Sequence, residues 1–325
     1  MIKLAKAVTG FLAASLVSCS VCYAQSLAPL TVLVFGPPSL GAFLPPIIKN
    51  RKFDEKNGLA INFVERTPDA YSTQFNSGEF QVGGSASLVT IGLAAVRGVK
   101  VTYLFNLYDY WSYVVTSRPE VKTLKDLEGK ELAAARGTTI FVMFEWFARQ
   151  QGVDMSKIAL INTAPPGLLG YALADRAAGI HIWDPGYTTL MQKNPSLRSL
   201  DLDIHQSWEK FTGTRSIPYL GVAAHTEWVE KNPQLVPKLY ATYKDAVDWT
   251  LTNPDEASSI IISTGTANEQ KAVADLIRAN DRLGLNIQWA ADLRKELLSV
   301  YRVGREMGIL PSEPGPETIY TPHAK

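Results

Sequence analysis

The feature that most restricts the fold is the alternation of short apolar runs with helix-like segments over residues 27–218. The runs are rich in β-branched and aromatic residues and end in turn-forming residues, as β-strands do. They lie at 31–35, 59–64, 80–82, 100–105, 111–116, 131–135, 158–162 and 179–183. Alternating strands and helices predict an α/β fold, in which a mostly parallel sheet carries helices on both faces.

The pattern changes after Pro218. One more strand-like run, 219–224, is followed by amphipathic helical patterns at 232–251, 254–263, 267–283 and 290–307 and by a Pro-rich tail from Pro311. A chain of 325 residues with 46% hydrophobic content can form about two domains. Only 19% of the residues are charged and the net charge is +1, which excludes the basic surface typical of nucleic-acid-binding proteins.

The first 24 residues have the layout of a secretory signal peptide. Lys3 and Lys6 precede a short apolar stretch at 7–17, and the small residues Cys22 and Ala24 form a cleavage site. A second interpretation is a lipobox at 16–19, with Cys19 as a lipid anchor. Both cysteines lie in this segment. We therefore expect a periplasmic protein that, if cleaved after Ala24, has no disulfide or thiol chemistry.

Small and polar residues follow four of the expected strands where a helix is about to begin. In α/β sheets such turns point helix N-termini at a ligand beyond the carboxyl ends of the strands. Each turn alone is explained better by ordinary helix capping, but four in one chain favour a shared binding site. The residues are Gly36, Pro38 and Ser39; Ser85 and Ser87 after Gly83-Gly84; Arg136, Gly137, Thr138 and Thr139; and Trp183 with Asp184.

Aromatic residues lie close to these turns. Tyr110 and Trp111 stand at the start of one expected strand, and Trp183 at the end of another. Rings beside polar groups suit a small organic ligand with an apolar part, although core packing explains each ring equally well. Arg136 is either an anion partner or an exposed structural residue, and Asp184 either caps a helix or accepts a hydrogen bond from the ligand.

Catalytic and metal-binding motifs are missing from the sequence. It contains no HExxH, Gly-x-Ser-x-Gly, Walker or GxGxxG motif, and its four histidines have no metal-ligand spacing. We therefore expect a binding protein without metal or cofactor, and not an enzyme. His181 keeps an enzymatic alternative open, because its spacing from Trp183 places both on one face of a strand.

Several stretches together resemble the periplasmic substrate-binding proteins of ABC importers for nitrate, taurine, alkanesulfonates and thiamine precursors. "FNSGEFQVGGSAS" resembles their first Gly/Ser loop, and "VKTLKDLEGKELAAARGTT" resembles the entry into their second lobe. "GIHIWDPGYTTL" resembles their strand that ends in Trp-x-Pro, and the segment at 229–258 resembles the helical return to the first lobe. The resemblance covers roughly residues 30–310.

This resemblance implies a type II-like fold of two α/β lobes that close over a ligand in the cleft between them. Lobe one would comprise 28–114 and 219–325, and lobe two 115–218, with crossings near 114–118 and 216–221. Carried over by position, ligand contacts would come from the four turns, and Tyr110 and Trp111 could form the floor of the site. Pro37-Pro38 departs from the family pattern, since proline lacks an N–H donor.

The hypothesis from the sequence is a monomeric solute-binding protein that delivers a small organic anion, a sulfonate or carboxylate, to a membrane permease. The alternatives are a thiamine-precursor (pyrimidine) binding protein or biosynthetic enzyme on the same fold, and a ligand-sensing partner of a receptor.

Overall fold

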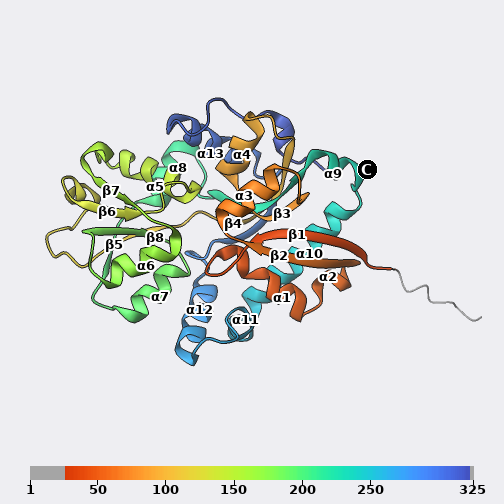
Figure 1. Ribbon diagram of the computed structural model, residues 1–325, viewed down its shortest axis with the longest axis horizontal. Coiled ribbons are helices and arrows are strands. Elements are labelled where there is room, and N and C mark those ends of the chain that lie inside the picture. The colour runs from red at the N-terminus through yellow and green to blue at the C-terminus, as the bar shows by residue number, and fades with distance from the viewer. Residues whose placement is uncertain (1–25, 323–325) are drawn as a thin grey trace, which may run out of the picture.

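The computed structural model describes residues 26–322, in which two β-sheets lie side by side with helices around them (Figure 1). The expected signal peptide and Cys19 lie outside the described residues. The first sheet has six strands in the order β11-β4-β10-β3-β1-β2. These strands are β1 (Ala28–Phe35), β2 (Leu59–Arg66), β3 (Val82–Ser87), β4 (Val101–Asp109), β10 (Pro218–His225) and β11 (Leu285–Trp289).

The second sheet has five strands in the order β7-β6-β8-β5-β9. Its strands are β5 (Tyr113–Thr116), β6 (Glu131–Ala134), β7 (Ala159–Asn162), β8 (Gly179–Ile182) and β9 (Arg198–Leu200). Both sheets are mixed: β10 and β11 run against their neighbours in the first sheet, and β5 does so in the second. The remaining strands share one direction in each sheet, so the predicted α/β fold is confirmed, with these reversed strands as the exceptions.

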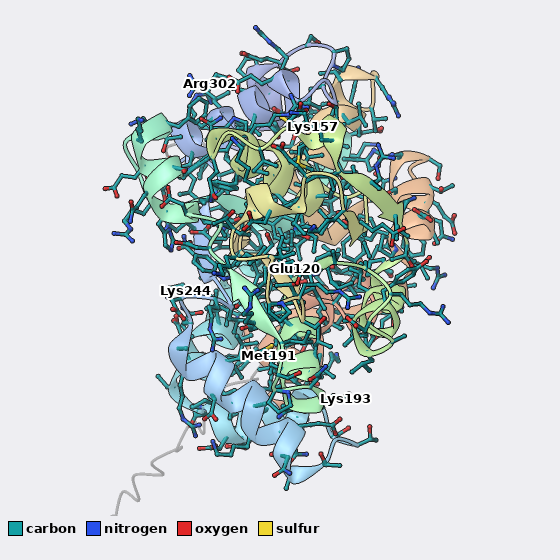
Figure 2. The ribbon with its side chains drawn as sticks, turned by 90° about the vertical axis from the view of Figure 1, so that its left-hand side faces the viewer. Glu120, Lys157, Met191, Lys193, Lys244 and Arg302 are labelled. Atoms are coloured by element: carbon teal, nitrogen blue, oxygen red, sulfur yellow. The ribbon has the colours of Figure 1, made fainter. Side chains whose placement is uncertain are left out.

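The helices between the strands cover both sheets. α1 (Leu44–Asn50), α2 (Phe53–Lys56), α3 (Pro68–Asn76) and α4 (Leu88–Val96) follow strands of the first sheet. α5 (Thr139–Gln150), α6 (Pro165–Leu173), α7 (Gly186–Lys193) and α8 (Ile204–Thr212) follow those of the second. α9 (Thr226–Lys231), α10 (Leu235–Thr252), α11 (Pro254–Ile261), α12 (Ala267–Ala279) and α13 (Arg294–Glu306) complete the chain. Charged side chains such as Lys157, Lys193 and Lys244 lie at the periphery (Figure 2).

The strand expected at 80–82 is misplaced, because β3 begins at Val82 and continues through Gly83, Gly84 and Ser85 to Ser87. The two glycines are therefore inside a buried strand and not in a turn. A Cβ atom on Gly83 would lie 2.1 Å from the Tyr71 hydroxyl, and one on Gly84 would lie 2.5 Å from the Tyr243 hydroxyl. The glycines thus make room for two tyrosines packed against the two faces of the sheet.

The chain passes between the sheets twice. It leaves β4 at Asp109 and enters β5 at Tyr113, and it returns between α8 and β10 through residues 213–217. Tyr113 and Val114 pair with β8, so we would place the first crossing at 110–112 and not at 114–118. The lobe boundaries themselves stay a prediction.

One apolar core extends from the first sheet to helices α5 and α8. It contains the fully buried rings of Trp146, Trp208 and Phe147, which pack on one another. Helix α13, which packs against the first sheet, contacts this group: the Trp146 ring N–H donates to Glu306 at 3.1 Å, and the Arg302 guanidinium lies 4.1 Å from the Phe211 ring centre. A smaller core fills the other face of the second sheet.

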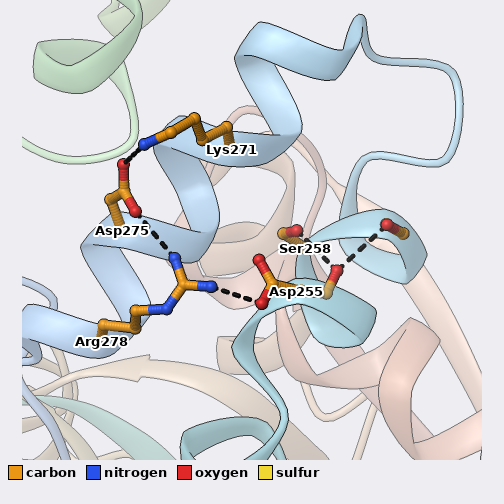
Figure 3. Close-up of polar contacts among 6 residues, drawn as sticks. Asp255, Ser258, Lys271, Asp275 and Arg278 are labelled. Atoms are coloured by element: carbon orange, nitrogen blue, oxygen red, sulfur yellow. Dashed lines mark hydrogen bonds and ion pairs between the residues drawn. The ribbon is translucent and has the colours of Figure 1, made fainter.

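Helix α12 is attached to α11 by an exposed ion pair (Figure 3). Arg278 pairs with Asp255 of α11 and, at 2.7 Å, with Asp275, which also pairs with Lys271. Exposed pairs contribute little energy each, but α12 also contacts α7 through a 2.9 Å hydrogen bond from Gln192 to the Asn268 carbonyl. The loop that follows α12 is thereby placed beside the second sheet.

Candidate functional site

The N-termini of α4 and α5 meet between the two sheets. Ser87 ends β3 and precedes α4, and Thr139 begins α5. The Ser87 hydroxyl donates to the Thr139 hydroxyl at 2.5 Å, and Thr90 lies 3.4 Å from the same oxygen. The positive ends of two helix dipoles therefore converge, which is an arrangement that favours a negatively charged or oxygen-rich group between them.

The start of α5 has unused hydrogen-bond donors. Within the described part of the chain, the backbone N–H groups of residues 137–140 have no acceptor. Thr138 serves as the helix cap: its hydroxyl accepts from the Phe141 N–H at 3.2 Å and donates to the Ala135 carbonyl at 2.8 Å. Arg136 and Gly137 are exposed. The turn is thus both a capped helix start and a set of free donors.

An apolar pocket lies between the first turn and the second sheet. Pro38 contributes from the first turn, and Trp183 from the end of β8. Its volume of ≈ 20 Å³ holds about one water. The remaining walls are Pro165, Leu168, Leu169, Ile182 and Gly186. An organic group larger than water could enter only if these walls moved apart.

Asp184 forms a buried polar centre behind Trp183. It is 3% exposed and accepts from the Tyr113 hydroxyl at 2.9 Å and from the Thr188 N–H at 3.2 Å. Burial raises the pKa of Asp184, whereas Thr188, Tyr113 and the Arg282 guanidinium oppose this rise. Asp184 is thus hydrogen-bonded by residues of β5 and α7, and Arg282 from the loop after α12 interacts with it electrostatically. The sequence did not point to Tyr113 or Arg282, which lie far from the turns in the chain.

Other predicted site residues are engaged in packing. Tyr110 is 2% exposed, is hydrogen-bonded to Ser112 at 2.6 Å and stacks on Phe147. Ser39 caps a short 3₁₀ turn by accepting from the Gly41 N–H at 3.2 Å. These bonds argue against direct ligand contact, although the predicted roles remain untested.

Two further predicted residues are half-buried. Gly36 donates its N–H to the Arg66 carbonyl at 3.1 Å. Trp111 packs 6.4 Å from the Tyr113 ring and 5.1 Å from the His205 ring, and its buried ring N–H has no partner among the described residues. Trp111 therefore keeps a donor that a ligand could use.

Ser85 is fully buried and accepts from the Phe35 N–H at 2.9 Å. We expect Ser85→Ala to lower the free energy of unfolding by about 1–2 kcal/mol, because a buried N–H loses its acceptor. Urea unfolding would measure this loss. Ligand affinity should stay unchanged, and an affinity loss without a stability loss would instead make Ser85 a ligand contact.

His181 does not have the surroundings of a catalytic base. It is fully buried, stacks on Phe144 at 4.3 Å and lies 6.1 Å from the Trp183 ring. Neither ring nitrogen has a partner within residues 26–322, and burial lowers the pKa of His181 to about 3. Over the same residues, no three His, Cys, Asp or Glu side chains are grouped to hold a metal ion, and no helix has the length and apolarity to cross a membrane.

Comparisons with known proteins agree with this architecture. The E. coli periplasmic aliphatic sulphonate binding protein SsuA superposes with a TM-score of 0.70 at 17% identity, over 89% of this chain and 96% of its own. The alkanesulfonate-binding protein SsuA of Xanthomonas axonopodis pv. citri, bound to MOPS, gives 0.70 at 16% identity over 88% and 96%.

Relatives in sequence carry less specific names. A Brucella abortus protein described only as a binding protein is 22% identical over 228 residues, which is 68% of this chain and 66% of its own length, just under two thirds. The sequence profile of the family described as NMT1/THI5 like matches residues 49–257. The chain therefore belongs to the NMT1/THI5-like family and has the fold of the periplasmic binding proteins.

Proposed function

We propose that the protein is the periplasmic solute-binding component of an ABC importer, and that it captures a small organic anion by closure of two lobes. The observation that supports this most is the convergence of the α4 and α5 N-termini at Ser87 and Thr139. Two positive helix ends repel each other unless a negative group lies between them. The free N–H groups of residues 137–140 are suitable donors for a sulfonate or carboxylate.

The apolar pocket supports an organic ligand over an inorganic one. Once the walls move apart, Pro38, Leu168 and Trp183 can hold an apolar body, with oxygens at its other end directed to the helix N-termini. The sulfonate ligands named for two similar structures fit this description. We therefore expect a monomer that delivers its ligand to a membrane permease and catalyses no reaction.

A second candidate is a pyrimidine-type thiamine precursor. Its support is the Asp184 carboxylate directly after Trp183, since a ring can stack on indole while an amino group donates to a carboxylate. The existing bonds of Asp184 to Tyr113 and Thr188 make it less available.

A thermal-shift screen of the chain from Gln25 onward tests both candidates. The ligands are alkanesulfonates, aromatic carboxylates, nitrate and pyrimidine precursors. A ligand at a hundred times its dissociation constant adds about 2.7 kcal/mol of stability. A shift by organic anions, with the ligand recovered unaltered, supports the proposal. A shift by pyrimidines alone supports the second candidate, and a ligand recovered as product would overturn both.

Thr139→Val should weaken binding of the anion that the screen identifies by roughly tenfold or more, because one hydroxyl at the helix junction is lost without a change in shape. Isothermal titration measures the affinity. Thr138→Val is the matched control: it removes the helix cap and should cost about 1 kcal/mol of stability with a smaller effect on affinity. Equal affinity losses in both variants would contradict the assignment of Thr139.

A further inference from the structure

A second, polar pocket lies beside the crossings between the sheets. Its volume is ≈ 300 Å³, and it shares no residue with the apolar pocket. Its walls come from the end of β4, from α8, from the return crossing and from the loop after α12. A volume of this size is at the lower end of the range for small-molecule sites.

One wall of this pocket is held rigidly. The Asp109 carboxylate accepts from Ser216 at 2.8 Å, from Asn286 at 2.9 Å and from Asn106 at 3.0 Å. These bonds join β4, the return crossing and β11, and the Tyr110 N–H also donates to the Ile217 carbonyl at 2.7 Å. Such a wall needs no reordering when a ligand arrives.

The other walls carry charged and polar groups that have few partners. In residues 26–322 the Arg215 guanidinium makes no hydrogen bond or ion pair with another residue. The Nδ1 atom of His205 is buried and has no partner there. The Asp281 side chain is 68% exposed, and its ion-pair contact is Arg282 at 3.9 Å.

These groups define the chemistry of a ligand. Arg215 presents a planar fork that suits a carboxylate, and Asp281 presents a carboxylate that suits an ammonium group. Burial and the nearby Arg215 lower the pKa of His205, so its neutral ring can donate one hydrogen bond or accept one. We propose that this pocket binds a small zwitterion, with its carboxylate on Arg215 and its ammonium group on Asp281, at a site separate from the cleft of the proposed function.

Calorimetric titration of the full chain with glycine, β-alanine and γ-aminobutyrate tests this site, because the three differ only in the spacing of their charges. At least one should bind measurably, while acetate and methylammonium, which each carry one of the charges, should bind far more weakly. Arg215→Gln and Asp281→Asn should each weaken the binding by roughly tenfold or more. Arg97→Gln, an exposed arginine at the far end of α4, should leave it unchanged.

Two outcomes overturn the proposal. One is no binding by any of the three zwitterions. The other is binding that Arg215→Gln and Asp281→Asn leave intact but Thr139→Val abolishes, which would place the zwitterion in the cleft. The first result leaves the proposed capture of an organic anion untouched, because that proposal is tested with a different ligand and different residues, whereas the second would add a zwitterion to the ligands of the cleft.

Discussion

Gly84→Ala is expected to lower the free energy of unfolding by about 2–3 kcal/mol, because its methyl group overpacks a sheet that is closed on both faces. The new Cβ would lie 2.5 Å from the Tyr243 hydroxyl and 2.9 Å from a methyl group of Val32. Gly84 is buried in the middle of β3, between β1 and β10, so the strand cannot shift without disturbing its neighbours. Urea unfolding followed by tryptophan fluorescence would measure the loss.

Tyr243→Phe provides the matched control. The Tyr243 hydroxyl is buried and has no hydrogen-bond partner among the described residues, so its removal alone should be neutral or slightly stabilising. In the Gly84→Ala background the same change should recover part of the lost stability, since the nearest clashing atom disappears. Additive effects of the two substitutions would show that the tyrosine hydroxyl is not the source of the strain.

The pair Gly83-Gly84 also shows why the position of β3 was predicted wrongly from the sequence. Gly-Gly-Ser is typical of a turn, and sequence alone cannot reveal that Tyr71 and Tyr243 occupy the space above the glycines. The α/β alternation was a stronger signal, because it extends over many elements. It predicted the fold correctly, whereas β9 and β11 were missed: β9 is only three residues long, and β11 lies between two helical patterns at 267–283 and 290–307.

The sequence predicted only those parts of the candidate site that are marked by the types of residues next to each other in the chain. The turns at Ser87 and Thr139 were identified from their residue types, and the structure brings them together across 52 positions of the chain. Arg282 and Tyr113 had no such signal, because each is close to the site only through folding. Ser85 belongs to the same sequence pattern as Ser87, but it lies inside β3, where it is fully buried and accepts from the Phe35 N–H, whereas Ser87 is the last residue of the strand and precedes α4.

His181→Leu is expected to stabilise the protein by about 1–3 kcal/mol at pH 7.5. His181 is fully buried among Phe141, Phe144 and Trp183, and both its ring nitrogens lack partners within the described residues. Burying polar atoms without hydrogen bonds is unfavourable, and an apolar side chain of similar volume removes that cost. Chemical unfolding of the wild type and the variant would measure the difference.

The pH dependence of this difference separates desolvation from simple repacking. Burial lowers the pKa of His181 to about 3 in the folded state, against an ordinary value of 6.5. Between these values the unfolded chain binds a proton that the folded chain excludes, so wild-type stability falls with falling pH by up to about 1.4 kcal/mol per unit through this group. The variant lacks this term, and its advantage should therefore grow as the pH falls below 6.5.

Comparing the wild type with His181→Leu also removes the contributions of other titrating groups from the stability difference. Burial raises the pKa of Asp109 to about 6, so Asp109 favours the folded state as the pH falls from 6 towards 3.8, which is the opposite sign. Both proteins contain Asp109, and its contribution drops out of the difference.

His225→Leu is the control for histidine removal: it breaks a 2.7 Å hydrogen bond to the Phe75 carbonyl and should destabilise the fold. A stability advantage of His181→Leu that stays constant from pH 7.5 to pH 5 would mean that His181 binds a proton in the folded state as readily as in the unfolded chain and is not held neutral by its surroundings.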